Sequence, residues 1–427
     1  MYDFVSELYP IQRSITGDGV RETLRRVGEK IALDVHEVPT GTQVADWTVP
    51  EEWNIREAYV VHRASGQRVI DVADHNLHLM GYSMPIECIL PFSSLERQLH
   101  TLPDRPRAIP YRTSYYKKQW GFCLTHEQFE RLDRNGLYHV VIDGELDNGH
   151  LTWAEAVLPG EQAETVLISV HSCHPRLAND NLSGIAVATY LARTLDHLAA
   201  TVGDRPRYTY RVVYAPGTIG AITWLATQSN HARNVVHGLV VANLGDGGGF
   251  HYKNTFAGDT EIDRAVAQVL ADRGLPHEIE PFVPFGYDER QYNSPGWRLP
   301  VGVFSRTPWG RYPEYHTSDD NLDLVRGEHL GTSLHRLLEI VRVLETNHRY
   351  RNTAPYGEPQ LGRRGLYRAI GGGDDDARQT ELALLWVLNM SDGKHDLLDI
   401  AKRSGMPYTT ILKAARALLD ADLLSAM

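Results

Sequence analysis

Two residues placed nine apart indicate a metal site at the end of a buried strand. His171 follows the continuous apolar run at 165–170, and Asp180 stands where the next helix is expected to begin. Neutral imidazole and carboxylate groups are zinc ligands, and a histidine at a strand end can meet a carboxylate at a helix start. Asn179 or Asp180 could equally serve as an ordinary helix cap, so the spacing alone leaves both interpretations open.

Asp246 and His316 occupy comparable places further along the chain. Asp246 lies in a glycine-rich loop just after the apolar run at 238–243, and His316 precedes a stretch rich in helix-capping residues. A tight turn and a structural histidine explain each residue when it is taken alone, and the loop lacks a phosphate-binding fingerprint. Because the carboxyl ends of parallel strands gather at one edge, we expect these side chains and His171 to meet there.

The elements that would position these side chains alternate between strand and helix from residue 126 onward. The expected strands are 138–142, 149–157, 165–170, 208–214, 238–243 and 301–304, and the expected helices are 182–198, 221–228, 262–273 and 330–346. Such alternation predicts an α/β fold with a mainly parallel sheet sandwiched by helices. Ligands bind such sheets at the carboxyl ends of their strands, which is where the candidate residues fall.

The remaining segments predict a chain of several domains. Residues 1–35 show helical periodicity and join 126–350 in one α/β domain, whereas 36–125 have the short apolar runs of a small β-rich insert. We expect 351–379 to be a linker that contains an acidic, glycine-rich run. Residues 380–427 carry three short amphipathic helices, which predict a winged-helix (helix-turn-helix) domain.

Composition limits the classes of protein that fit. The chain has 427 residues, a formal charge of −11 and three cysteines, which excludes a disulfide scaffold and suits a reducing, cytoplasmic compartment. We expect no signal peptide, and we find no run of about 18 apolar residues that would cross a membrane. The expected recognition helix at 408–420 has only Lys413 and Arg416 as basic residues. We therefore expect docking or homo-oligomer formation rather than nucleic-acid binding.

Longer motifs indicate a family. The order of strand-end His171, Ala-Asn-Asp-Asn-Leu-Ser-Gly at 178–184, strand-end Asp246 and His-Thr-Ser-Asp-Asp at 316–320 resembles the co-catalytic zinc aminopeptidases. Over nearly its whole length, the chain resembles aminopeptidase-like bacterial proteins that have a C-terminal winged helix. That resemblance is carried by the motifs at 111–117, 120–123, 288–292, 294–296 and 391–395.

The resemblance implies a zinc-exopeptidase-like fold and a set of metal ligands. His171, Asp180 and His316 match ligand positions, with Asp180 as the carboxylate that can bridge two metals. Asp246 matches the acidic ligand of the other metal. The aminopeptidases have an aspartate two residues after the first histidine, where this chain has Cys173. The neighbouring His174 is therefore expected to orient or replace a ligand.

One departure from the family pattern affects the expected chemistry. The aminopeptidases carry a Glu-Glu pair after the next strand, the first as general base and the second as a zinc ligand, but this chain has Gly217 and Thr218. Glycine cannot accept a proton, and the lost ligand favours one zinc over two. Glu289 and Glu314 are the candidate replacements for the base, whose role is typically worth about 10²–10⁴-fold in rate.

Arg290 and Tyr292 follow Glu289 in the same motif. A guanidinium binds carboxylates through two parallel hydrogen bonds, and a phenol can stabilise an oxyanion. We therefore expect Arg290 to hold a substrate carboxylate and Tyr292 to hold an oxyanion. A surface salt bridge and a packed tyrosine are equally good interpretations of these two residues.

These features favour a zinc-dependent, aminopeptidase-like hydrolase that removes an N-terminal aminoacyl group, or cleaves a related amide, in a small peptide or peptide-like metabolite. Two alternatives stay open because Gly217 lacks a side chain. The chain could be a degenerate peptidase that binds such a ligand without turnover, or its scaffold could serve another amide reaction in a biosynthetic pathway. A transcriptional regulator is disfavoured by the slightly acidic last segment.

Overall fold

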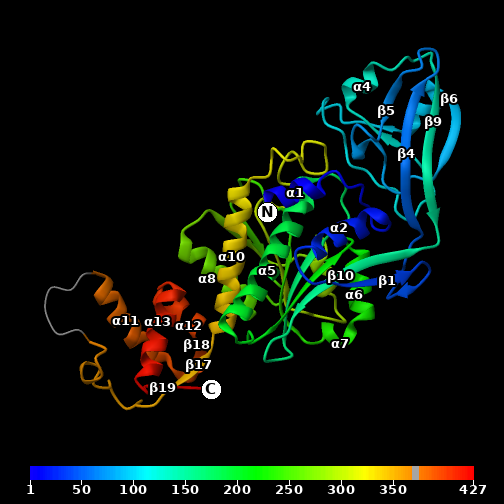
Figure 1. Ribbon diagram of the computed structural model, residues 1–427. Helices are drawn as coiled ribbons and strands as arrows, with labels where there is room; N and C mark the ends of the chain where they lie inside the picture. Colours follow the sequence, from blue (N-terminus) through cyan, green and yellow to red (C-terminus); the bar gives the residue numbers. More distant parts are fainter. Residues whose placement is uncertain (368–374) are drawn as a thin grey trace. The chain divides into compact units, whose positions relative to one another are not determined.

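The computed structural model describes residues 1–367 and 375–427, which divide into two units (Figure 1). The first unit comprises Met1–Phe256 with Glu280–Leu334, and the second comprises Ala257–Ile279 with His335–Met427. The acidic run expected within the linker falls largely outside the described residues. Among the helices of the described residues, none is both long enough and apolar enough to cross a membrane.

A large sheet forms the core of the first unit, and only the strand at one edge (277–280) belongs mainly to the second unit. Its strand order is β1-β10-β12-β11-β13-β16-β14-β15, and the adjacent strands β12, β11, β13 and β16 are parallel. The bounds are β1 Asp34–Pro39, β10 His150–Leu158, β11 Thr165–His171, β12 Thr209–Ala215, β13 Val235–Val241, β14 Phe250–Lys253, β15 His277–Glu280 and β16 Val301–Ser305. β1, β10 and β14 pair in antiparallel fashion at the sides. The predicted α/β fold class is confirmed, with the parallel strands at the centre of the sheet.

The connections of β11 create a crevice at its carboxyl end. β11 is buried along its whole length, which suits the centre of a parallel sheet. The chain leaves β11 through α5 (Gly184–Val202) to β12 on one side, then returns through α6 (Ile219–Thr227) and α7 (Ser229–Ala232) to β13 on the other. Right-handed crossovers in opposite directions place these helices on opposite faces, and ligands bind where such connections diverge.

A four-stranded antiparallel sheet forms the β-rich part of the first unit (Figure 1). Its order is β5-β4-β9-β6, with β4 at Glu52–His62, β5 at Arg68–Asp71, β6 at Ile86–Pro91 and β9 at Leu137–Asp147. The extent of this sheet differs from the expected 36–125, because β1 belongs to the central sheet and β9 lies beyond residue 125. Periodicity identifies a strand, but it does not tell which sheet the strand joins.

Shorter elements complete the first unit. They are α1 (Tyr2–Leu8), α2 (Asp18–Gly28), α3 (Phe92–Leu95), α4 (His126–Glu130), α9 (Glu289–Tyr292) and the strand pairs β2 (Gln43–Val44) with β3 (Trp47–Thr48) and β7 (Leu99–His100) with β8 (Phe122–Cys123). α4 begins at a capping box, in which Thr125 and Gln128 exchange hydrogen bonds. α10 (Gly327–Thr346) crosses from the first unit into the second.

The second unit contains a winged helix. Its helices are α8 (Glu261–Arg273), α11 (Asp375–Met390), α12 (Leu397–Ser404) and α13 (Tyr408–Asp420), and its sheet has the order β18-β17-β19 (Asp392–Asp396, Arg349–Asn352, Leu424–Ala426). We expected the winged helix to start at residue 380 and a linker to occupy 351–379. Instead, β17 at Arg349–Asn352 is already the central strand of the small sheet. A run of four residues with one apolar side chain, Tyr350, is too short to show strand periodicity, so β17 gave no signal.

Candidate metal centre

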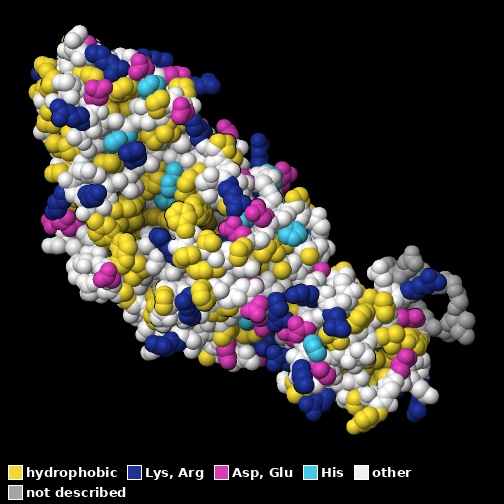
Figure 2. Space-filling view, turned by 180° about the vertical axis from the view of Figure 1, so that it is seen from behind, with side chains coloured by type: hydrophobic (Ala, Val, Ile, Leu, Met, Phe, Trp, Pro, Cys, Tyr) yellow, Lys and Arg dark blue, Asp and Glu magenta, His cyan; other side chains and the backbone are white. Residues whose placement is uncertain are grey.

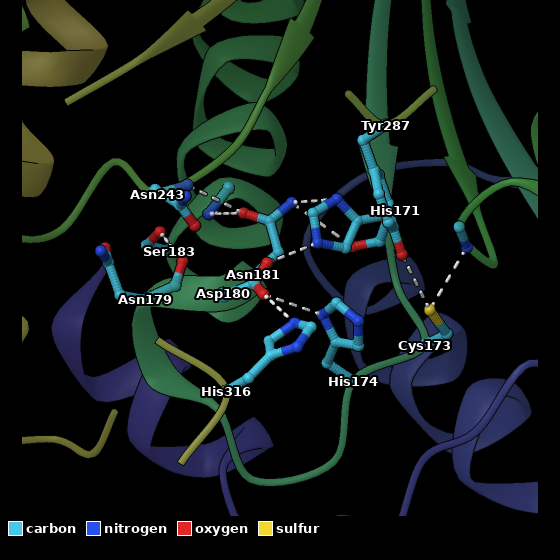
Figure 3. Close-up of polar contacts among 12 residues, drawn as sticks. His171, Cys173, His174, Asn179, Asp180, Asn181, Ser183, Asn243, Tyr287 and His316 are labelled. Atoms are coloured by element: carbon cyan, nitrogen blue, oxygen red, sulfur yellow. Dashed lines mark hydrogen bonds and ion pairs between the residues drawn. The ribbon is translucent and has the colours of Figure 1, made fainter. Parts of the chain in front are cut away.

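Three histidines converge on the carboxylate of Asp180 (Figure 3). His171 Nε2 lies 2.7 Å from Asp180 Oδ1, and His316 Nε2 and His174 Nδ1 lie 3.0 and 3.3 Å from Oδ2. His171 ends β11, His174 lies in the next loop, Asp180 lies in the turn before α5, and His316 lies in the loop after β16. The structure therefore brings together these four predicted residues from segments up to 145 positions apart in the chain.

The chemistry of this donor set fits a divalent cation. His171, His174 and Asp180 each offer a ligand atom within 4.8 Å of the others, and all three side chains are buried. His174 Nδ1 is buried and faces the Asp180 carboxylate at 3.3 Å, so this atom is directed at the place a shared cation would take. Burial opposes the ionisation of Asp180, but the charge of His174 and hydrogen bonds from the three imidazoles hold its pKa well below the usual range. Imidazole nitrogens and a carboxylate in a water-poor site are a set that zinc prefers.

A second carboxylate fixes the backbone that carries Asp180. Asp320 accepts hydrogen bonds from the backbone N–H groups of Asn179 and Asp180, at 2.6 and 3.0 Å. Asn181 adds a second constraint, because its amide nitrogen lies 3.3 Å from His171 Nδ1 and its Oδ1 accepts from the Asn243 N–H. Of the two interpretations that the sequence left open at Asn179 and Asp180, a simple cap does not describe this network, which orients the candidate ligands.

The aromatic segment after residue 108 covers the centre. The Tyr111 N–H donates to the His316 carbonyl at 2.9 Å, and the Tyr111 ring lies edge-on to His174 and His316, with ring centroids 5.2 and 5.0 Å away. Its hydroxyl contacts that of Tyr115 at 3.1 Å. Figure 2 shows histidine side chains beside a hollow that apolar side chains surround. Sequence reasoning missed Tyr111, because an aromatic loop looks the same whether it packs on a core or on a site.

Tyr287 fills the space that a side chain at position 217 would need. A Cβ built on Gly217 would collide with the hydroxyl and ring of Tyr287. That hydroxyl lies 3.7 Å from Cys173 Sγ, which also accepts the Gly217 N–H at 3.3 Å, and the Tyr287 ring lies 4.4 Å from the ring of His171 (Figure 3). Tyr287 was missed from the sequence, although the absence of a side chain at Gly217 was a signal that something else occupies its place.

The structure places Asp246 in a hydrogen-bond network of its own. Its carboxylate accepts from the Asn179 amide at 2.9 Å, from the Thr307 hydroxyl at 2.6 Å and from the Gly248 N–H at 2.7 Å. Both oxygens are therefore engaged by protein groups. The role of ligand to a second metal, which the resemblance implied, has no support in this geometry, and Asp246 instead positions Asn179 beside Asp180.

The four residues expected to act on substrate are dispersed. Glu289 is buried in an ion pair with Lys253 at 2.8 Å, and Tyr292 is fully buried with its hydroxyl 2.8 Å from Ser169, so neither faces the centre. This corrects the expected base and oxyanion roles, because Glu289 is held by Lys253 and the Tyr287 N–H and Tyr292 is packed in the core. Arg290 keeps a buried Nε without a hydrogen-bond partner, and Glu314 is half-buried two residues before His316.

Asp288 is a further buried carboxyl that the sequence did not single out. Its Oδ1 accepts the backbone N–H of Thr218 at 2.7 Å, so it holds the loop in which the aminopeptidases carry their Glu-Glu pair. Burial raises the pKa of Asp288 to about 7, although the hydrogen bond from Thr218 acts in the opposite direction. Near neutral pH this carboxyl is therefore close to its titration midpoint.

Comparisons with known proteins agree with this fold. Residues 2–347 match a family described as a domain of unknown function (DUF4910), and residues 348–426 match a winged helix-turn-helix family. The chain belongs to the DUF4910 family. This DUF4910 chain is 46% identical over 424 residues to a Clostridium acetobutylicum protein named for polysaccharide biosynthesis and an aminopeptidase-like domain, with 99% of this chain and 95% of that protein covered.

Two solved structures extend the comparison for the DUF4910 chain. A crystal structure from Clostridium acetobutylicum, named as a peptidase, has a TM-score of 0.92 and 44% identity, and covers 100% of this chain and 96% of that one. A zinc aminopeptidase from Bacillus subtilis has a TM-score of 0.57 at 12% identity, with 80% and 93% covered, and shares the fold. The predicted resemblance to aminopeptidase-like proteins with a winged helix is confirmed.

Replacement of Gly217 by alanine should destabilise the protein, because the new Cβ and Tyr287 cannot share one space. We expect a loss of about 1–3 kcal/mol in the free energy of unfolding, measured by urea denaturation. The Gly217→Ala/Tyr287→Ala double variant lacks the Tyr287 ring and so has no clash. Its loss in the free energy of unfolding should therefore be smaller than the sum of the losses in the two single variants. The control Gly296→Ala, at a glycine with open space around it, should change stability by less than about 0.5 kcal/mol. A Gly217→Ala variant as stable as the wild type would contradict the steric account.

The pH dependence of stability should report the buried Asp288. An unfolded aspartate has a pKa near 3.9, so between about pH 4 and pH 7 the folded state holds a proton that the unfolded state releases. The free energy of unfolding of the metal-free protein should therefore fall as pH rises through this window. Asp288→Asn should flatten the fall, with the exposed Asp204→Asn as its control. Identical slopes for wild type and Asp288→Asn in urea titrations would refute this account.

Proposed function

We propose that this protein is a zinc-dependent amide hydrolase of the aminopeptidase type, acting on a small N-terminal aminoacyl compound or a related amide. The proposal rests on the convergence of three histidines on the buried carboxylate of Asp180. His171, His174, His316 and Asp180 would hold one zinc ion. When bound, zinc supplies Lewis acidity, which polarises a carbonyl group and acidifies water.

The surrounding side chains determine how a proton can move. In amide hydrolysis the oxygen of water bonds to the carbonyl carbon, the C–N bond breaks, and the leaving nitrogen gains the proton that the water loses. Glu289 is committed to Lys253, whereas Glu314 lies next to the centre in the chain, with no hydrogen bond or ion pair to its carboxylate among the described residues. Glu314 is therefore the candidate base. Tyr111 packs over the histidines and limits the access of bulk water.

Tyr287 favours a second candidate function, an amide reaction in polysaccharide biosynthesis. A phenol in place of the usual glutamate donates a hydrogen bond, and burial raises the pKa of Tyr287 well above its ordinary value, so it keeps its proton. Such a group can hold the oxygen of an amide, but it is a poor acceptor for the proton of water. The Clostridium acetobutylicum relative is named for polysaccharide biosynthesis, which would make an amino-sugar amide the substrate.

Zinc binding should depend strongly on Asp180 and less strongly on Asp320. Loss of a residue that only orients a ligand typically weakens metal binding by about 10–100-fold, so we expect this range for Asp320→Asn and a loss of at least about 100-fold for Asp180→Asn. The exposed Asp204→Asn is the matched control, because the same change removes a charge outside the centre and its network. Zinc titration by calorimetry, with metal content from mass spectrometry, checks these values. Equal affinities for Asp180→Asn and the wild type would overturn the proposed centre.

Turnover of amides should require the metal and the four proposed ligands. We expect zinc-loaded protein to hydrolyse aminoacyl nitroanilides or N-acyl amino sugars, and the rate should fall to background after chelation or in His316→Ala. Glu314→Gln should lower kcat by about 10²–10⁴-fold without a change in zinc content if this residue is the base. Tight zinc binding without turnover of either substrate class would favour the degenerate, ligand-binding alternative.

A further inference from the structure

A cavity of about 310 Å³ lies in the first unit beside the metal centre, and none of its lining residues belongs to the proposed ligands. Two short links join them. The loop that carries Tyr287 against His171 also supplies Phe285 to the cavity wall, and Asn243 on the cavity floor donates its N–H to Asn181, the residue after Asp180. The cavity therefore lies next to residues that flank the centre.

The floor of the cavity offers buried polar groups that the protein leaves unused. Asn243 Oδ1 and Ser305 Oγ line it, and neither has a hydrogen-bond partner, although the residues are only 1% and 3% exposed. A buried polar atom without a partner typically costs about 1–3 kcal/mol. Hydroxyl groups of a ligand would remove that cost, since the amide oxygen accepts a hydrogen bond and the serine hydroxyl can donate or accept one.

Two aromatic side chains line the cavity beside aliphatic ones, and the charged side chains and His251 on its lining have ion-pair partners. Phe285 is 66% exposed and packs edge-on against Trp309, with ring centroids 5.2 Å apart. Lys253 is paired with Glu289 at 2.8 Å, and Arg311 with Glu280 at 2.8 Å. Paired charges argue against an anionic ligand such as a phosphate. Aromatic faces instead attract the weakly positive C–H groups of a neutral ring.

We propose that this cavity binds a neutral pyranose ring, with its C–H face on Phe285 and Trp309 and its hydroxyls on Asn243 and Ser305. This inference rests on the proposed function, because it assigns a sugar to the substrate whose amide reaches the metal centre. Ligand pockets typically span about 300–1,000 Å³, so the cavity is near the lower limit and suits one ring. The substrate class is accordingly an amide of an amino sugar.

Binding of N-acetylglucosamine and methyl glucoside by the full-length protein tests the proposal. Calorimetry or saturation-transfer NMR should detect millimolar or tighter binding, and Trp309→Ala should weaken it by at least about tenfold. Ser305→Ala removes one hydrogen-bond partner, which should cost about 2–13-fold in affinity. Trp47→Ala, at a partly exposed tryptophan outside the cavity, is the matched control and should bind as the wild type does.

The same measurement separates this proposal from the proposed function. Metal-free protein and Asp180→Asn should still bind the sugar, so a failed metal centre would leave the sugar signal in place. Leucine amide and inorganic phosphate serve as competing probes. Binding of leucine amide or phosphate that Trp309→Ala abolishes, without sugar binding, would overturn the proposal, as would the absence of any sugar signal at millimolar concentrations.

Discussion

The buried negative charge of Asp180 is the constraint around which the site is built. A carboxylate removed from water is costly unless cationic or hydrogen-bonding partners surround it, and here three imidazoles serve as those partners. Asp320 adds a second carboxyl close by, which is satisfied by backbone N–H groups and so fixes the turn before α5. The proposed zinc ion would add positive charge where these carboxyl groups lie closest together.

The side chains of the centre can meet because the topology brings distant segments of the chain to one edge of the central sheet. β11, β12 and β13 end side by side, and their connections diverge to opposite faces, so the crevice between them is bounded by short loops. The β-rich part then contributes Tyr111, whose backbone pairs with the loop of His316. The centre therefore depends on segments from three regions of the chain, each placed by a different sheet or loop.

The sequence predicted the site residues that lie at strand ends, but it did not predict those that long loops bring to the site. His171, Asp180 and His316 could be found because each falls just beyond an apolar run or in a family motif. Tyr287 and Tyr111 could not, since no periodicity tells where a long loop returns. Asp246 was expected at the metal from its strand-end position and the family resemblance, and Glu289 from its motif, but hydrogen bonds and an ion pair engage their carboxylates. The observed limits of the sheets differ from the expected domain limits for a related reason. The sheet that β9 or β17 joins depends on its partner strands and cannot be told from its own residues.

The interlock of Gly217 with Tyr287 has a consequence for how this sequence can change over time. The two positions are 70 residues apart in the chain, yet a larger residue at one requires a smaller residue at the other. A change from Gly217 to a larger residue and a change from Tyr287 to a smaller one each lower stability when made alone, because the first creates a clash and the second leaves a cavity. The two positions are therefore expected to change together during divergence.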